Sequence, residues 1–475
     1  AMSSDEFWLR VHGLRLADAL INENKEIAAT ALQLVDDPEY IVQWQLAFTL
    51  GELHSSEAVR ALVNLARKYP RDNDMRVAIL SSVNPVAEEM ALSLTRDYIE
   101  NDQASLSAYV VELARIVGAR NETAEVNHLL EAVLGYEEEL TAKRLVLSAL
   151  NEGLARSGAG LTAYLTSDRP SASVTQLAEK QFELAAELAM DDAAAESVRS
   201  DAVELLAFAE FELAVETLPD LLGAQVPRKL QIAAIEALAE QNETEVGDVL
   251  IENWKGYSPD VRNTVIDKLL TRAERVETLL NAVEAGTIKS AEIAQERKQL
   301  LQNHPNSEIK DKARSLFQVA SNEDVAKVIS QYTKALAGDT DRERGHQVFV
   351  KNCAVCHQVG SEGHKVGPEL ASVKNKSEED LLIAILDPNR ETQANFVSYT
   401  AVSQDGKLYN GIITAESADS ITLRQSEGKE VTILRSNIDE LASSGLSLMP
   451  QGMEKNITPE QMADLVFFIK KIGEE

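Results

Sequence analysis

Residues 345–370 read GHQVFVKNCAVCHQVGSEGHKVGPEL and contain the run Cys353-Ala354-Val355-Cys356-His357. The spacing C-x-x-C-H is the attachment motif of a c-type haem. Two thiols about one helical turn apart can each bond to one vinyl group of the same haem, and the histidine that follows can reach the iron from the same side. The sequence therefore predicts one covalent haem c, attached through Cys353 and Cys356, with His357 as the proximal iron ligand.

Two other uses of this cysteine pair are less favoured. A structural zinc ion needs four ligands, whereas the sequence has two cysteines, and the nearest further histidines are His346 and His364. A thioredoxin-like redox pair would stand beside a βαβ pattern, but the residues around Cys353 follow a helical pattern. A disulfide framework is also excluded, because nothing else in the chain could pair with these two thiols.

The flanks of the motif resemble the small class I cytochromes c. Gly345 and Phe349 stand where the N-terminal helix of that family packs against its C-terminal helix. Phe468, in the run DLVFFIK, matches the aromatic position of that C-terminal helix. A glycine between the two helices lets their backbones approach closely. The resemblance therefore implies that residues 338–475 form a class I cytochrome c-like helical domain.

The same resemblance implies two further contacts of the iron site. Gly367-Pro368 stands where the family places a proline whose carbonyl accepts a hydrogen bond from the proximal histidine, which would fix the ring of His357 and raise its basicity. The candidates for the distal ligand are Met449, Met453, His364 and His346. Met449-Pro450 resembles the distal ligand loop of the family, so Met449 is the expected distal iron ligand. Met453 and Met462 fit core packing better.

The distance between the two expected ligands points to a more specific family. Met449 follows His357 by 92 residues, further than in a small cytochrome c. Residues 340–475 resemble the PVC-type haem-binding domain described for planctomycetes and verrucomicrobia. The matching runs are GHQVFVKNCAVCH, GPEL, LLIAILDPN, DGKLYNG and SLMPQGM. That domain often ends a long chain, after HEAT-like repeats and a propeller resembling sugar dehydrogenases. The propeller does not occur in this sequence, which is expected either of a fragment or of a separate subunit.

Residues 1–337 follow a repeated helical pattern. Val198-Arg199, Leu230-Gln231 and Val261-Arg262 each begin a run of apolar residues at helical spacing, and they recur 32 and 31 residues apart. Looser copies begin at Val42-Gln43 and Met75-Arg76. One such helix pair cannot bury its apolar face alone, whereas stacked neighbours can. The pattern predicts a HEAT-like α-solenoid, with an irregular helical bundle as the alternative.

Local signals divide the region after residue 337. We expect a helix over 341–357, a helix capped by Ser377 that ends at Asp387-Pro388, and a last helix over 458–472 that begins at Thr458-Pro459. Between them the apolar period becomes two, which predicts a small antiparallel β insertion over about 396–438. Its expected hairpin turn is Asp405-Gly406, and its expected strands are 396–402, 408–414, 420–424 and 430–434.

Composition limits the function classes. The net charge of −31 over 475 residues argues against nucleic acids and anionic membranes as partners, and it favours either simple solubility or steering of a basic partner. Residues 338–475 hold 14 basic and 22 acidic residues, so most of the negative charge lies in residues 1–337. No apolar run is long enough to span a membrane, and the start AMSSDEFW is not a secretory signal.

These patterns predict electron transfer. A haem with two strong protein ligands has no open position for a substrate, so we expect no catalytic residues and an electron-transfer module of a dehydrogenase system. The expected partners are a redox protein, such as a sugar dehydrogenase-like domain or subunit, and a downstream acceptor, with the solenoid as docking scaffold. The alternative is a haem enzyme or ligand sensor with an open or displaceable distal position. Attachment to C-x-x-C-H, as the cytochrome c resemblance implies, predicts a periplasmic or other extracytoplasmic location.

Overall fold

The computed structural model describes residues 1–101, 103–136, 139–317, 323–390 and 393–473. The chain forms two compact units, Ala1–Ala214 and Val215–Glu475. Both are mainly helical, and the second also holds two small β sheets. Of the helices in the described residues, none combines the length and apolar character that a membrane crossing requires. The predicted domain boundary at residue 338 stays a prediction.

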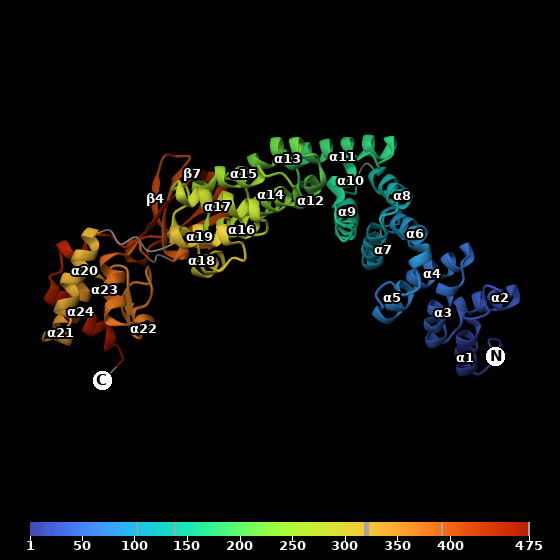
Figure 1. Ribbon diagram of the computed structural model, residues 1–475, viewed down its shortest axis with the longest axis horizontal. Helices are drawn as coiled ribbons and strands as arrows, with labels where there is room; N and C mark the ends of the chain where they lie inside the picture. Colours follow the sequence, from blue (N-terminus) through green and yellow to red (C-terminus); the bar gives the residue numbers. More distant parts are fainter. Residues whose placement is uncertain (102, 137–138, 318–322, 391–392, 474–475) are drawn as a thin grey trace. The chain divides into compact units, whose positions relative to one another are not determined.

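The first unit is built from helices that stack in two layers (Figure 1). One layer consists of α1 (Phe7–Ala17), α3 (Tyr40–Glu52), α5 (Asn73–Leu80), α7 (Ser107–Arg120), α9 (Leu140–Ala155) and α12 (Glu196–Leu205). The other consists of α2 (Lys25–Gln33), α4 (Ser56–Lys68), α6 (Ala87–Glu100), α8 (Thr123–Leu134) and α11 (Ala172–Met190). The short α10 (Leu161–Leu165) packs on α9, and α13 (Phe211–Thr217) contains the boundary between the two units. Within each layer, every helix packs against the next one named.

The second unit begins with the same kind of packing. Its first helices are α14 (Arg228–Glu240), α15 (Val246–Glu252), α16 (Pro259–Leu269), α17 (Ala273–Glu284), α18 (Gln295–Gln302) and α19 (Ser307–Phe317). Helix α14 packs on α16, while α15, α17 and α19 pack in succession. The predicted repeats at 230 and 261 begin α14 and α16, so the repeated sequence pattern corresponds to successive helices of one layer.

In four of the five repeats the polar residue is buried, and its side chain donates to a carbonyl oxygen of the chain segment that precedes its own helix. The exception is Arg76, which is half-buried and donates to the side chain of Asn73. The donor and acceptor pairs are Gln43 to Asp37 (2.6 Å), Arg199 to Ala189 (2.9 Å), Gln231 to Gly223 (2.6 Å) and Arg262 to Trp254 (2.8 Å). The repeated Arg or Gln therefore satisfies a carbonyl that the turn leaves without a helical partner.

The β insertion forms a five-stranded antiparallel sheet in the order β6-β5-β4-β3-β7. Its strands are β3 (Val397–Ser403), β4 (Leu408–Glu416), β5 (Ser420–Arg424), β6 (Glu430–Leu434) and β7 (Ile438–Ser447). The bounds of β5 and β6 match the prediction, and Gly406 has the left-handed φ of +77° that the hairpin turn requires. The predicted end of the insertion at 438 is wrong, because β7 continues to Ser447 and pairs with β3.

The remaining helices surround one apolar core. They are α20 (Glu323–Ala335), α21 (Arg342–Asn352), α22 (Leu370–Val373), α23 (Glu378–Leu386) and α24 (Pro459–Lys470), with the short hairpin β1 (Gln358–Val359) and β2 (Glu362–Gly363). Ser377 caps α23 and Thr458 caps α24, as predicted. Helix α20 precedes residue 338, yet it packs on α23 and α24. Its Tyr332 hydroxyl donates to the carbonyl of Ile457 (2.8 Å).

Helices α21 and α24 cross at Gly345. A Cβ on Gly345 would collide with the carbonyl oxygen of Asp464. One turn further along α21, the rings of Phe349 and Phe468 lie 5.6 Å apart between centroids. Asp464 also accepts from the backbone N–H of Asp341 (2.7 Å) and pairs with Arg344 (2.8 Å). The glycine therefore allows a close backbone contact, which the Phe349–Phe468 packing and the Arg344–Asp464 ion pair stabilise.

Replacing this glycine tests the crossing. Gly345→Ala should lower the free energy of opening of α21 and α24 by about 1–3 kcal/mol, because the added methyl group forces the backbones apart. Hydrogen exchange measured by mass spectrometry on the full chain should show faster exchange in both helices. Gly256→Ala is the control, since a Cβ there would lie 3.5 Å from the nearest atom, an ordinary contact. Unchanged exchange in α21 and α24 of the Gly345 variant would contradict the account.

Candidate haem site

The C-x-x-C-H motif lies on a turn directly after α21. The predicted helix over 341–357 is too long, because α21 ends at Asn352 and Cys353 is its C-terminal cap. The backbone N–H groups of Cys353 and Ala354 both donate to the carbonyl of Phe349 (2.8 and 3.0 Å), which breaks the regular helical hydrogen-bond series. A new turn then starts, in which His357 N–H donates to the carbonyl of Cys353 (2.8 Å).

The chain after His357 folds back onto the motif. The hairpin of β1 and β2 reverses its direction, and the N–H of His364 donates to the carbonyl of Ala354 (3.0 Å). The N–H groups of Val366 and Gly367 both donate to the carbonyl of Cys356 (2.9 and 2.7 Å). The backbone on both sides of the second cysteine is therefore held by residues that follow the histidine.

The ring of His357 is held in one orientation. Its Nδ1 lies 2.8 Å from the carbonyl oxygen of Pro368. A carbonyl can only accept, so the proton is on Nδ1 and the lone pair of Nε2 is available to a metal. Burial lowers the pKa of His357, although the hydrogen bond to Pro368 opposes this shift. A neutral imidazole with this tautomer is the form that binds iron.

Gly367 leaves room for the ring. A Cβ at this position would lie 2.5 Å from Cε1 of His357 and 2.9 Å from Nδ1. Every other residue would therefore push the imidazole away from the Pro368 carbonyl. The pair Gly367-Pro368 thus acts as one unit, in which the glycine admits the ring and the proline carbonyl orients it. These residues fit a haem whose iron is bound from the His357 side.

The two thiols are free, which thioether attachment requires. Neither Cys353 nor Cys356 is in a disulfide. Burial raises the pKa of Cys353 to about 12 and also raises the pKa of Cys356. Among the described residues, no group of three or more His, Cys, Asp or Glu side chains could hold a metal ion. The pair therefore lacks the further ligands that a structural zinc requires.

Met449 lies on the loop between β7 and α24. Its N–H donates to Oγ of Ser447 (3.2 Å), and the N–H of Ser447 donates to Asn389 (2.8 Å). The N–H of Leu448 donates to the carbonyl of Phe396 (3.2 Å). These contacts fix the loop against the segments that flank residues 391–392, and the side chain of Met449 is half-buried.

Of the other distal candidates, Met453 and His346 are engaged elsewhere, whereas His364 is exposed. Met453 and Met462 are buried in the core around Phe349 and Phe468. His346 Nε2 lies 2.6 Å from a carboxylate oxygen of Glu362, and its ring lies 5.3 Å from that of Phe468. His364 is exposed on the loop that follows the motif.

The sheet also reaches the motif, which the sequence did not indicate. The N–H of Glu427, in the turn between β5 and β6, donates to the carbonyl of Val355 between the two cysteines (3.0 Å). The guanidinium of Arg424 donates to the carbonyl of Lys365 (2.9 Å). Both acceptors are backbone atoms, 72 and 59 residues before their donors in sequence, and a backbone acceptor leaves no sequence signal.

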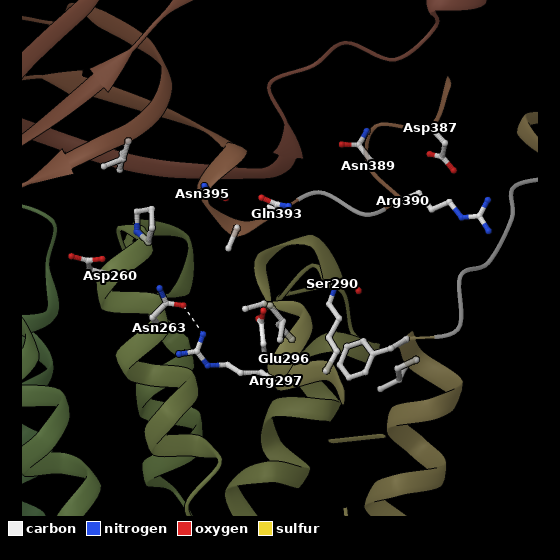
Figure 2. A pocket seen from close by; sticks show the side chains of 18 of the residues that line it. Asp260, Asn263, Ser290, Glu296, Arg297, Asp387, Asn389, Arg390, Gln393 and Asn395 are labelled. Carbon is white, nitrogen blue, oxygen red and sulfur yellow. Dashed lines mark hydrogen bonds between the residues drawn. The ribbon is translucent and has the colours of Figure 1, made fainter. Parts of the chain in front are cut away.

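A large polar cavity of the second unit lies apart from the motif. Its volume is about 1170 Å³, and its described lining comes mainly from α16, α18, β4 and the segments around residues 387–395. Figure 2 shows Arg297 directed toward Asn263, with which it makes a hydrogen bond of 2.8 Å, and Arg297 also pairs with Asp267. Gln451 lines this cavity, whereas neither cysteine nor His357 does.

Comparison with known proteins agrees with the geometry. A family model described as Cytochrome c matches residues 342–410. This span begins with α21, contains the motif and His357, and ends within β4. Residues 342–410 are therefore similar to the class I c-type cytochromes, a family that implies covalently bound haem c, electron transfer and a redox partner. Such domains are typically extracytoplasmic. No curated protein matches the chain.

Gly367→Ala tests the packing of the proximal ring. The added methyl group should displace the His357 imidazole from Pro368, so we expect a lower haem content and a changed absorption spectrum. Both are measured on the purified full chain, with the haem quantified per polypeptide. Gly360→Ala, on the same loop, is the control, because a Cβ there meets nothing within 4 Å. Since Gly360 has φ +59°, this control costs only about 1–2 kcal/mol of backbone strain. Full haem content and a normal spectrum in Gly367→Ala would contradict the assignment.

Proposed function

We propose that this protein relays single electrons through one haem c, attached by Cys353 and Cys356 and bound by His357 and Met449. The observation that carries the proposal is the hydrogen bond from Nδ1 of His357 to the carbonyl of Pro368. It presents Nε2 to the iron, and Gly367 supplies the space that this orientation needs. The bound haem supplies a one-electron couple between ferrous and ferric iron.

The case for Met449 rests on its place in the chain and on the state of its rivals. It lies on the hydrogen-bonded loop between β7 and α24, whereas His346 is paired with Glu362 and Met453 is in the core. With both His357 and Met449 bound to the iron, no position would remain for a substrate. Methionine ligation also raises the reduction potential, which suits acceptance of electrons from a dehydrogenase.

The protein groups around the haem control its properties. The Pro368 carbonyl holds the Nδ1 proton of His357, which raises the basicity of the ligating nitrogen. The two thioether bonds would anchor the haem to the turn after α21. Half-burial of Met449 and burial of the core below Phe349 would limit the access of water. None of these groups transfers a proton or a substrate atom, so this chain has no catalytic residues in our proposal.

The wider assignment follows the sequence resemblance. We propose that residues 340–475 form a PVC-type haem-binding domain, and that the stacked helices before it form a HEAT-like solenoid. The stacking of alternate helices in two layers supports this. In this view the solenoid is the docking scaffold for a sugar dehydrogenase-like partner or domain outside the cytoplasm, such as in the periplasm. Its excess of acidic residues favours a partner with a basic surface.

Met449→Ala tests the distal ligand. The wild-type protein should show a six-coordinate low-spin haem with the sulfur-to-iron charge-transfer band. The variant should lose that band, and its reduction potential should fall, because the methionine sulfur stabilises ferrous iron. Absorption spectra during a redox titration measure both effects.

The control for this test is Met453→Ala, which removes a thioether from the neighbouring core and should keep the band. An unchanged spectrum in Met449→Ala would move the ligand to His364 or His346. A five-coordinate, high-spin wild-type haem would instead support a haem enzyme or ligand sensor with an open distal position.

A further inference from the structure

The hairpin of β5 and β6 holds the haem-binding loop at two points. Glu427 N–H donates to the carbonyl of Val355, which lies between the two cysteines (3.0 Å). The Nη1 group of Arg424 donates to the carbonyl of Lys365 (2.9 Å). One contact lies on each side of His357 in sequence, so the β hairpin spans the loop that carries the proximal ligand.

Arg424 is fixed on its own sheet. It stands opposite Glu430 in the pairing of β5 with β6. Its Nε and Nη2 groups donate to one carboxylate oxygen of Glu430 (2.9 and 2.7 Å). Glu430 therefore orients the guanidinium, and the remaining Nη1 group points to Lys365. The planar guanidinium holds its donors in a fixed fork, so it can keep two acceptors in one set geometry, whereas the donors of a lysine ammonium all lie on one freely rotating nitrogen.

The sheet itself is fastened to the last repeats at two buried sites. Arg435 pairs with Glu416 (2.9 Å) with both side chains almost fully buried, and it also donates to Gln231 (3.2 Å) of α14. At the second site, Ser443 of β7 donates to Glu292 (2.8 Å), which is also paired with Arg262 of α16. Buried charges with this many partners resist displacement. The hairpin that contacts the haem loop is therefore part of a sheet that the helical repeats hold in place.

Arg424 contacts the segment that orients the iron ligand. Lys365 directly precedes Val366 and Gly367, whose N–H groups donate hydrogen bonds to the carbonyl of Cys356. The next residue, Pro368, accepts a hydrogen bond from Nδ1 of His357. We propose that Arg424 is a positioning residue, which sets the strength of the His357–Pro368 hydrogen bond by holding this segment in place. The inference rests on the proposed ligation of haem iron by His357.

Loss of the Arg424 contact and loss of the Arg424 positive charge should shift the reduction potential in opposite directions. A strong hydrogen bond at Nδ1 makes the imidazole a better donor and stabilises ferric iron, which lowers the potential. Weakening this bond should therefore raise the potential. Loss of a positive charge near the haem also stabilises ferric iron, and so lowers the potential. A variant that keeps the charge but loses the geometry separates the two effects.

Three variants of the full-length, haem-containing protein provide the test. Arg424→Lys keeps the charge and loses the double contact, Arg424→Ala loses both, and Lys429→Ala removes one positive charge from the same turn. Lys429 is exposed, which makes it the charge-matched control. The reduction potential of each is measured by spectroelectrochemical titration, with haem content and absorption spectrum as the check that the variant has folded.

The proposal expects the potential of Arg424→Lys to lie above that of the wild type, and the potential of Arg424→Ala to lie above that of Lys429→Ala. Equal potentials in Arg424→Lys and wild type, together with equal potentials in Arg424→Ala and Lys429→Ala, would overturn it, because charge alone would then account for the effect. A wild-type protein without haem, or with an iron not bound by histidine, would refute the proposed function as well.

Discussion

At Gly345 the backbones of α21 and α24 approach so closely that a side chain would collide with the carbonyl of Asp464. The haem site depends on this contact, because it fixes the helix whose end carries the motif. Phe349 connects the helix crossing to the haem motif. Its ring packs on Phe468, and its carbonyl accepts hydrogen bonds from the N–H groups of Cys353 and Ala354. The packing of the two helices therefore determines where the first cysteine leaves α21.

In sequence, the five-stranded sheet lies between α21 and α24, and it contacts both the helical repeats and the haem loop. Hydrogen bonds from Arg435 to Gln231 and from Ser443 to Glu292 join it to the repeats, and a hydrogen bond from Arg424 to Lys365 joins it to the haem loop. The insertion thus lets the helical repeats and the loop that carries the proximal ligand share one sheet.

Local features of this fold could be read from the sequence, whereas long-range contacts could not. The thiol and histidine spacing, the Ser377 cap and the strands β5 and β6 each depend on a few neighbouring residues. Strand β7 was missed because its sequence, IDELASSGLS, is polar and Gly-containing, and because only pairing with β3 makes it a strand. The contact of Arg424 with the haem loop could not be predicted either, because its acceptor is the backbone carbonyl of Lys365. The resemblance to class I cytochromes pointed to Gly367-Pro368, but the clash that forbids a side chain at Gly367 required coordinates.

The central claim is that both axial positions of the iron are filled by the protein, so that the haem only passes electrons. Exposure of the reduced, full-length protein to carbon monoxide tests this most directly, because the gas binds ferrous haem only where a position is open or its ligand is easily displaced. The account predicts an absorption spectrum that does not change at neutral pH. Rapid formation of a carbonyl complex would contradict it and would assign the chain to ligand binding or catalysis instead.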